Sequence, residues 1–188
     1  MIGLPSEEDE DLVAIRDLTL QLHEIMLKHA RPRGRIGRIV ASVNPLVPKP
    51  GTAYQWLPMV RTDEIERKMK RMRSLVADID NVYFNIKSER HSYYQALLSL
   101  GDRRVASTIE AAERNGGQWR AAVAETELDA AFYIFRDRSH DPVLPWDIID
   151  GGMKASFFKS EFEKGLREES TLPPKRQKEN ARLLPVLQ

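Results

Sequence analysis

The sequence predicts an α/β fold, and two observations support this prediction. Through the first half of the chain, amphipathic helical patterns alternate with short β-branched patterns in the order helix, strand, helix, strand. The first strand then runs into residues 42–56, a segment with three prolines. Because proline lacks an amide donor and forces the preceding residue into extended geometry, the chain must leave the sheet here as a stiff loop. In α/β folds, ligands bind at this end of the strands.

The first predicted helix covers residues 8–29. Ser6 and the acids at 7–11 predict its N-terminus, and Pro32 with Gly34 predict its end. Its apolar residues recur at helical spacing. These residues are Leu12, Ile15, Leu18, Leu22, Ile25 and Met26.

Two strands and a second helix follow. A buried strand is predicted over 38–43 and an alternating strand over 81–87. Between them, Thr62 and Asp63 are predicted to cap a helix over 64–77. Its apolar stripe consists of Ile65, Met69, Met72 and Val76.

The second half of the chain is predicted to be mostly helical. A short extended piece is expected over 132–135 and a loop over 142–150. The tail from residue 168 is rich in Pro, Lys, Arg, Gln and Glu and is expected to be disordered. The predicted helices cover 90–100, 102–114, 118–125 and 153–167.

Composition excludes several classes of protein. The 188 residues are 41% hydrophobic and 30% charged, which is typical of a globular protein with a real core. The net charge of +1 argues against nucleic acid or a membrane surface as a partner. No apolar run reaches the ~18 residues of a spanning helix, and no signal-peptide pattern is visible, so we expect a cytoplasmic protein. The absence of cysteine excludes disulfides, thiolate zinc sites and a cysteine-bound iron–sulfur cluster within this chain.

Four motifs carry a resemblance to a known family. They are MIGLP at 1–5, SVNPLVPKPGTAYQW at 42–56, SER at 88–90 with QALLSLGDRR at 95–104, and LPWDIID at 144–150. In this order they resemble the C-terminal part of radical S-adenosylmethionine (SAM) enzymes, in the branch that often carries an N-terminal cobalamin-binding domain. The resemblance covers residues 1–165.

The resemblance implies three parts. Residues 1–78 would be the last helix-strand-helix portion of a partial (β/α) barrel, residues 79–167 a mostly helical α+β cap, and residues 168–188 a disordered tail. A barrel remnant of this size would expose an apolar sheet edge and face, so we expect the isolated chain to be prone to aggregation.

The resemblance also implies a chemistry that this chain cannot perform alone. The whole enzyme would use a 4Fe–4S cluster to cleave SAM, and whether it uses cobalamin stays open. The cluster-binding CxxxCxxC motif of the family lies upstream of the MIGLP-like segment. We therefore expect an upstream half, from the same chain or a split gene, as partner, and no cofactor bound stably by this chain alone. Met1 inside the MIGLP motif suggests an internal start, a split gene or a truncation. The family's tail often carries cysteines that residues 171–188 lack, which puts an auxiliary metal site in doubt.

The resemblance assigns cofactor-pocket residues to two segments. In the first turn these are Gly3, Pro5 and Glu7, where a glycine lets a ligand approach the backbone. After the first strand they are Asn44 and Pro45. An ordinary capped turn and a structural loop are the alternatives for these two segments.

Three further residues of the proline loop are expected to contact substrate. Lys49 could meet a carboxylate or phosphate, and Trp56 could stack on a flat ligand or the corrin face. Gln55 is the third. The alternative is that the aromatic residues of the loop cover the barrel end.

Three other clusters are better explained by structure than by chemistry. Residues 87–94, with His91 near Glu89, could supply an acid or base, but a helix start with solvated charges is the better interpretation. The acids and arginines at 136–150 fit an ion-paired loop anchored by Trp146 better than a metal site, and no residues have catalytic or metal-binding spacing.

The remaining cluster is a basic run over 67–73. Basic residues on a helix can bind RNA phosphates, but preceding acids favour a solvated outer face. The run nevertheless defines the alternative function, a stand-alone binding or scaffold domain without catalysis that contacts RNA through this helix. The DNA immediately upstream distinguishes the two functions, because only an enzyme fragment requires a CxxxCxxC-containing sequence there.

Overall fold

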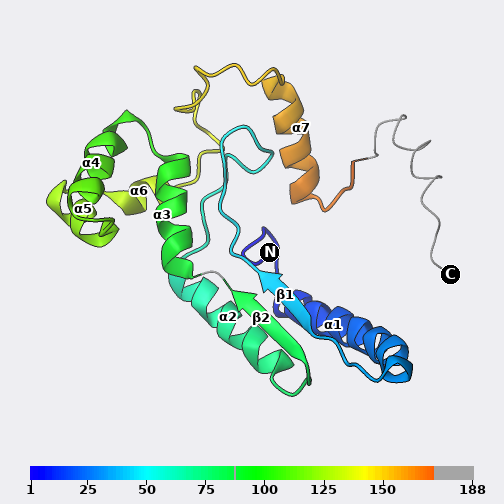
Figure 1. Ribbon diagram of the computed structural model, residues 1–188. Helices are drawn as coiled ribbons and strands as arrows, with labels where there is room; N and C mark the ends of the chain where they lie inside the picture. The colour runs from blue at the N-terminus through cyan, green and yellow to red at the C-terminus, as the bar shows by residue number, and fades with distance from the viewer. Residues whose placement is uncertain (87, 172–188) are drawn as a thin grey trace.

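The computed structural model describes residues 1–86 and 88–171, so Lys87 and the tail predicted beyond residue 171 lie outside the described residues. Two strands and seven α-helices are found in the described part (Figure 1). They are α1 (Asp9–Ala30), β1 (Ile39–Val43), α2 (Thr62–Val76), β2 (Val82–Ile86), α3 (Glu89–Leu100), α4 (Ala106–Arg114), α5 (Trp119–Glu125), α6 (Ala130–Phe135) and α7 (Ala155–Leu166), with 3₁₀ turns at Arg31–Arg33 and Arg103–Val105.

The two strands are parallel, as α/β connections require. They pair in register from Ile39 opposite Val82 to Val43 opposite Ile86. The start of the chain adds an isolated parallel bridge between Ile2 and Pro45 on the continuation of β1. The Ile2 amide donates to the carbonyl of Asn44 at 3.0 Å. Figure 1 accordingly shows the N-terminus beside the arrowhead of β1.

Helices α1 and α2 run side by side and share the main core with the sheet. Arg16 Nε of α1 donates to the carbonyl of Leu75 near the end of α2 at 3.0 Å. The predicted stripe of α2 is confirmed, because all four of its residues are buried in one cluster with Ile2, Leu12 and Val43. Burial of this stripe is the main reason for α2 to form, since side chains of this kind contribute about 1.5–3 kcal/mol each.

The other face of the sheet is bare among the described residues. Val40 and Tyr83 are paired in the register, and their side chains are 55% and 53% exposed. The first strand was predicted to be buried, but helices cover only one of its two faces. Side chains alternate along a strand, so only every second residue of β1 reaches the core.

The apolar residues that recur along α1 are only partly buried. Leu12 is fully buried, whereas Leu18, Leu22 and Ile25 are about half exposed. The helix continues well beyond the end of α2, so its second half has little to pack against (Figure 1). Periodicity shows which residues share a helix face, but it cannot show whether another element covers that face.

The N-terminal caps differ from the prediction. Ser6 lies in a left-handed turn with φ of 61°, and the N-cap of α1 is Glu8, whose amide donates to Asp11 Oδ2 at 2.8 Å. Helix α2 begins at Thr62 with Arg61 as N-cap, so Thr62 and Asp63 lie in its first turn. Acids near a helix start stabilise it through the helix dipole even where they do not cap it.

Helices α4, α5 and α6 group on one side of α3, and α7 lies on the other side of the proline loop (Figure 1). Residues 132–135 are helical in α6, so the extended piece predicted there is wrong. Asp129 caps α6 by accepting from the Phe132 amide at 3.1 Å, while Tyr133 and Ile134 are buried. Tertiary packing here overrides the strand preference of aromatic and β-branched residues. No helix of the described residues is both long and apolar enough to cross a membrane.

Candidate functional site

The first turn of the chain is built around Gly3. This residue is buried with φ of 81°, a left-handed conformation that favours glycine. A Cβ at this position would approach Val60 Cγ2 to 3.3 Å. The Gly3 amide donates to Glu7 Oε1 at 3.0 Å. The turn is therefore held in shape by the side chain of Glu7.

Glu7 forms a buried ion pair with Lys68 of α2. Lys68 Nζ lies 2.6 Å from Glu7 Oε1. The Glu7 side chain is 5% exposed, and the Lys68 side chain is 7% exposed. Lys68 Nζ also donates to the Glu7 carbonyl at 3.2 Å. Lys68 belongs to the basic run that was predicted to be solvated, and this residue departs from that prediction. Since Glu7 already accepts from an amide and an ammonium, its main role is to fix the turn against α2.

A cavity of about 630 Å³ opens beside this turn. Pro5 and Glu7 line it, together with Tyr54 of the proline loop and Gly165 at the end of α7. Of the residues predicted to hold a cofactor, these two therefore reach a cavity. Gly3, Asn44 and Pro45 lie instead at the parallel bridge, where Pro45 is buried and Asn44 is partly exposed. The five residues form one continuous region at the carboxyl end of β1.

Gln55 joins the proline loop to the LPWDIID loop. Its Oε1 accepts from Trp146 Nε1 at 2.7 Å and from the Gly51 amide at 3.1 Å, and the residue is 5% exposed. A second cavity of about 490 Å³ lies here, between Gln55, Trp146, Asp147 and the first turn of α7. Two segments that carry the family resemblance are thus in direct contact.

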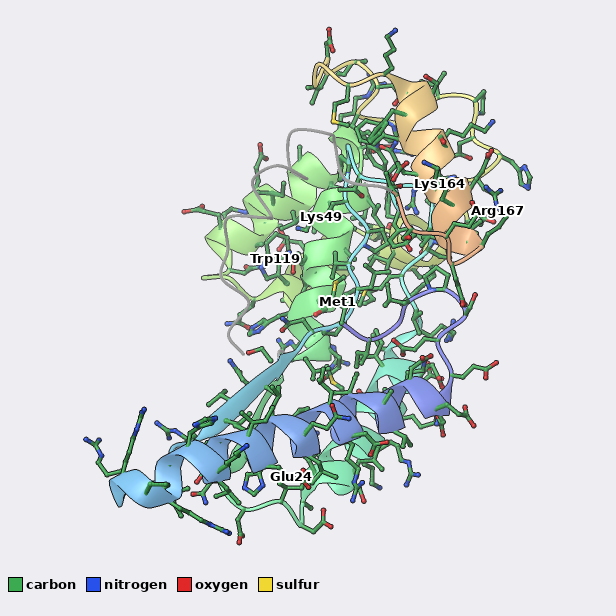
Figure 2. The ribbon with its side chains drawn as sticks, turned by 90° about the vertical axis from the view of Figure 1, so that its right-hand side faces the viewer. Met1, Glu24, Lys49, Trp119, Lys164 and Arg167 are labelled. Atoms are coloured by element: carbon green, nitrogen blue, oxygen red, sulfur yellow. The ribbon has the colours of Figure 1, made fainter. Side chains whose placement is uncertain are left out.

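Lys49 and Trp56 lie outside the linings of both cavities. Lys49 is exposed, and Figure 2 shows it on the loop beside α3. Trp56 is partly buried, with its ring 5.4 Å from that of Phe162 in α7. The Trp56 ring therefore helps to hold α7 in place.

Sequence reasoning missed that Arg138 is a buried residue that binds backbone carbonyls of the chain around it. This residue is fully buried, and its guanidinium donates to the carbonyls of Tyr133 and Arg136. Burial, followed by the neighbouring charge of Arg136, lowers the pKa of Arg138 to about 10. Arg136 in turn pairs with Asp141 at 2.6 Å. The prediction of an ion-paired loop thus agrees with the contacts, but nothing in the sequence distinguished the buried arginine from the exposed ones.

A smaller cavity lies beside the SER segment. It is lined by Glu89, Arg90, Tyr93 and Arg120, and burial raises the pKa of Tyr93. His91 is exposed and lies outside this lining. His91 and Glu89 therefore do not share a cavity, which agrees with the favoured interpretation of a helix start with solvated charges.

The donor set of this chain does not fit an iron–sulfur cluster. There is no cysteine to supply a thiolate. Within residues 1–86 and 88–171, no three His, Asp or Glu side chains are grouped as metal ligands. Comparison with known proteins found no matching family model, no matching curated protein and no matching solved structure.

Proposed function

We propose that this chain is the C-terminal part of a radical SAM enzyme and supplies one wall of its SAM and substrate pocket. The observation that best supports the proposal is the parallel bridge between Ile2 and Pro45. It brings the MIGLP turn beside the VNP segment at the carboxyl ends of parallel strands, the end where α/β folds bind ligands. The contact between Gln55 and Trp146 adds a link between two further motifs of the same resemblance.

The chain's own residues would bind and orient rather than react. Pro5 and Glu7 would line the ligand pocket, and Gly3 would hold the turn that carries them. Asn44 would offer an amide to a ribose or amino-acid group. Gln55 would line the part of the pocket that receives the substrate, whereas Lys49 and Trp56 lie outside both cavities and would contact a substrate only at its edge. When bound by the upstream half, the cluster would supply the electron that cleaves SAM. Because such clusters need reduced thiolates, we propose a cytoplasmic enzyme.

The bare face of the sheet supports a missing partner of this kind. Val40 and Tyr83 would face the inside of a barrel, while Leu18 and Leu22 of α1 would pack against the helix of a preceding unit. An upstream half would bury these apolar surfaces.

The test is complementation with the polypeptide encoded immediately upstream. We expect the chain alone, after anaerobic reconstitution with iron, to show neither cluster absorption nor SAM cleavage, and the combined halves to show both. In the combined halves, Asn44→Ala should raise the KM for SAM, whereas Arg71→Ala on the outer face of α2 serves as the control. Cluster absorption with SAM cleavage by residues 1–188 alone would overturn the proposal, as would an upstream sequence without CxxxCxxC.

The alternative of a scaffold that contacts RNA through the basic run over 67–73 has less support. Lys68 is buried against Glu7, and Arg67 is paired with Glu64 at 2.8 Å and with Asp9 at 3.2 Å. These contacts occupy two of the five cations of the run. The basic run over 67–73 is therefore not the surface of this chain best suited to bind nucleic acid.

A further inference from the structure

Positive charge is concentrated in one part of this nearly neutral chain. Residues 25–62 contain no Asp or Glu at all, although the whole chain has 28 of them. Seven Lys and Arg residues fall in this segment, five of them between residues 28 and 38. These five, which we call the basic turn, are Lys28, Arg31, Arg33, Arg35 and Arg38.

The fold gathers the basic turn at one end of the molecule. Helix α1 projects beyond α2, and Gly34, with φ of 65°, reverses the chain after the 3₁₀ turn. Residues 35–38 then return beside the last turns of α1, where a Cβ on Gly37 would lie 3.4 Å from Met26 Sδ. In Figure 2, nitrogen-tipped side chains project from this far end of α1. His29, Arg33 and Arg35 line a shallow cavity of about 470 Å³ there.

The charge of the basic turn is not neutralised within the described part of the chain. All five side chains are exposed, and among the described residues none lies within ion-pair distance of a carboxylate. Along the sequence, the nearest acids are Glu24 before the basic turn and Asp63 after it. Unpaired exposed cations attract the phosphates of a nucleic acid and release its counterions.

An aromatic side chain lies next to these cations. The guanidinium of Arg38 lies over the ring of Tyr83, 5.6 Å from its centroid, and this ring belongs to the bare face of the sheet. Exposed aromatic rings and guanidinium planes are surfaces on which unpaired bases stack. Four of the five cations are arginines, whose planar fork suits phosphate oxygens better than a lysine does. An anionic membrane surface is a less suitable partner than a nucleic acid. Asp17 and Glu24 flank the exposed apolar residues of α1, and their negative charges would be repelled by anionic lipid headgroups.

We propose that the basic turn, with Tyr83, binds single-stranded nucleic acid through phosphate contacts and base stacking. This inference goes beyond the proposed enzyme function and does not rest on it. It concerns the chain by itself, because an upstream half that covered the bare face of the sheet would also cover Tyr83. RNA and DNA share the chemistry that is recognised, so the experiment compares both.

The test is fluorescence anisotropy of labelled 12-nucleotide single strands, as RNA and as DNA, with the full chain over a salt series. Five phosphate contacts predict a slope of log affinity against log salt of about −3.5. Arg33→Gln with Arg35→Gln should weaken binding about tenfold and reduce the slope by about 1.4. Tyr83→Ser should weaken binding several-fold with the slope unchanged, because stacking releases no counterions.

The matched control is Lys70→Gln with Arg71→Gln, which removes the same charge from the exposed side of α2. It should change affinity by less than about twofold if binding is local to the basic turn. Circular dichroism of each variant checks that the fold is kept. An equal loss in the control, no binding to either single strand, or binding to phosphatidylserine vesicles in place of the strands would each overturn the proposal.

Discussion

The buried pair between Glu7 and Lys68 gives the sharpest prediction about stability. At 2.6 Å, with an effective dielectric constant of about 20, the two charges attract by about 6 kcal/mol, much of which offsets their desolvation. Lys68→Met removes the cation but leaves the Glu7 carboxylate buried. We therefore expect Lys68→Met to lower the free energy of unfolding by about 3–5 kcal/mol.

Urea unfolding at neutral pH, followed by circular dichroism, measures this loss. Combining Lys68→Met with Glu7→Gln removes both charges, so it should restore part of the stability despite its second substitution. The matched control is Arg67→Met, one position earlier on α2, which breaks a pair between half-exposed side chains and should cost less than about 1 kcal/mol. A loss below about 1 kcal/mol for Lys68→Met would refute the reasoning, because it would mean that the pair is solvated.

Three other predictions test the packing and its charges. Gly101→Ala should destabilise the chain by about 1–3 kcal/mol, because the new Cβ would lie 2.5 Å from Val105 Cγ2; unchanged stability in urea would contradict this contact. Met69→Ala should cost about 2–5 kcal/mol in the same assay, and a much smaller loss would show that α2 is not held through its apolar stripe. Arg104 holds the pKa of Asp102 down at about 2, so Asp102 contributes stability above about pH 4 that is lost as pH falls toward 2. The urea midpoint of Asp102→Asn should therefore fall less than that of the parent chain between pH 5 and pH 2.5, and parallel curves would exclude this contribution.

The sequence predicted the helices and strands well wherever a local signal was strong. The ends of α1, α2 and both strands agree with the predicted ranges to within two residues, because periodicity, glycine and proline act within a few residues of themselves. The error at α6 has the opposite cause. Its aromatic residues favour a strand locally, but burial of Tyr133 and Ile134 against the core selects a helix.

The candidate site was predictable only in part. Gly3, Glu7 and Gln55 were chosen from the sequence. Gly3 and Glu7 form the first turn, and Glu7 and Gln55 each line a cavity. Their partners could not be chosen in the same way. Lys68 and Trp146 lie 61 and 91 residues away from Glu7 and Gln55, and no local pattern marks such a pair.

The sequence by itself determined where helices and strands form, which side of α2 is apolar, and that the chain carries no cysteine. Tertiary structure alone decided that β1 is covered on one face, that Lys68 is buried among otherwise solvated cations, and that the basic turn is gathered at one end of α1. The physical reason is the range of the forces involved. Backbone preferences and hydrophobic periodicity act between near neighbours in the chain, whereas burial and ion pairing depend on which distant segments meet in space.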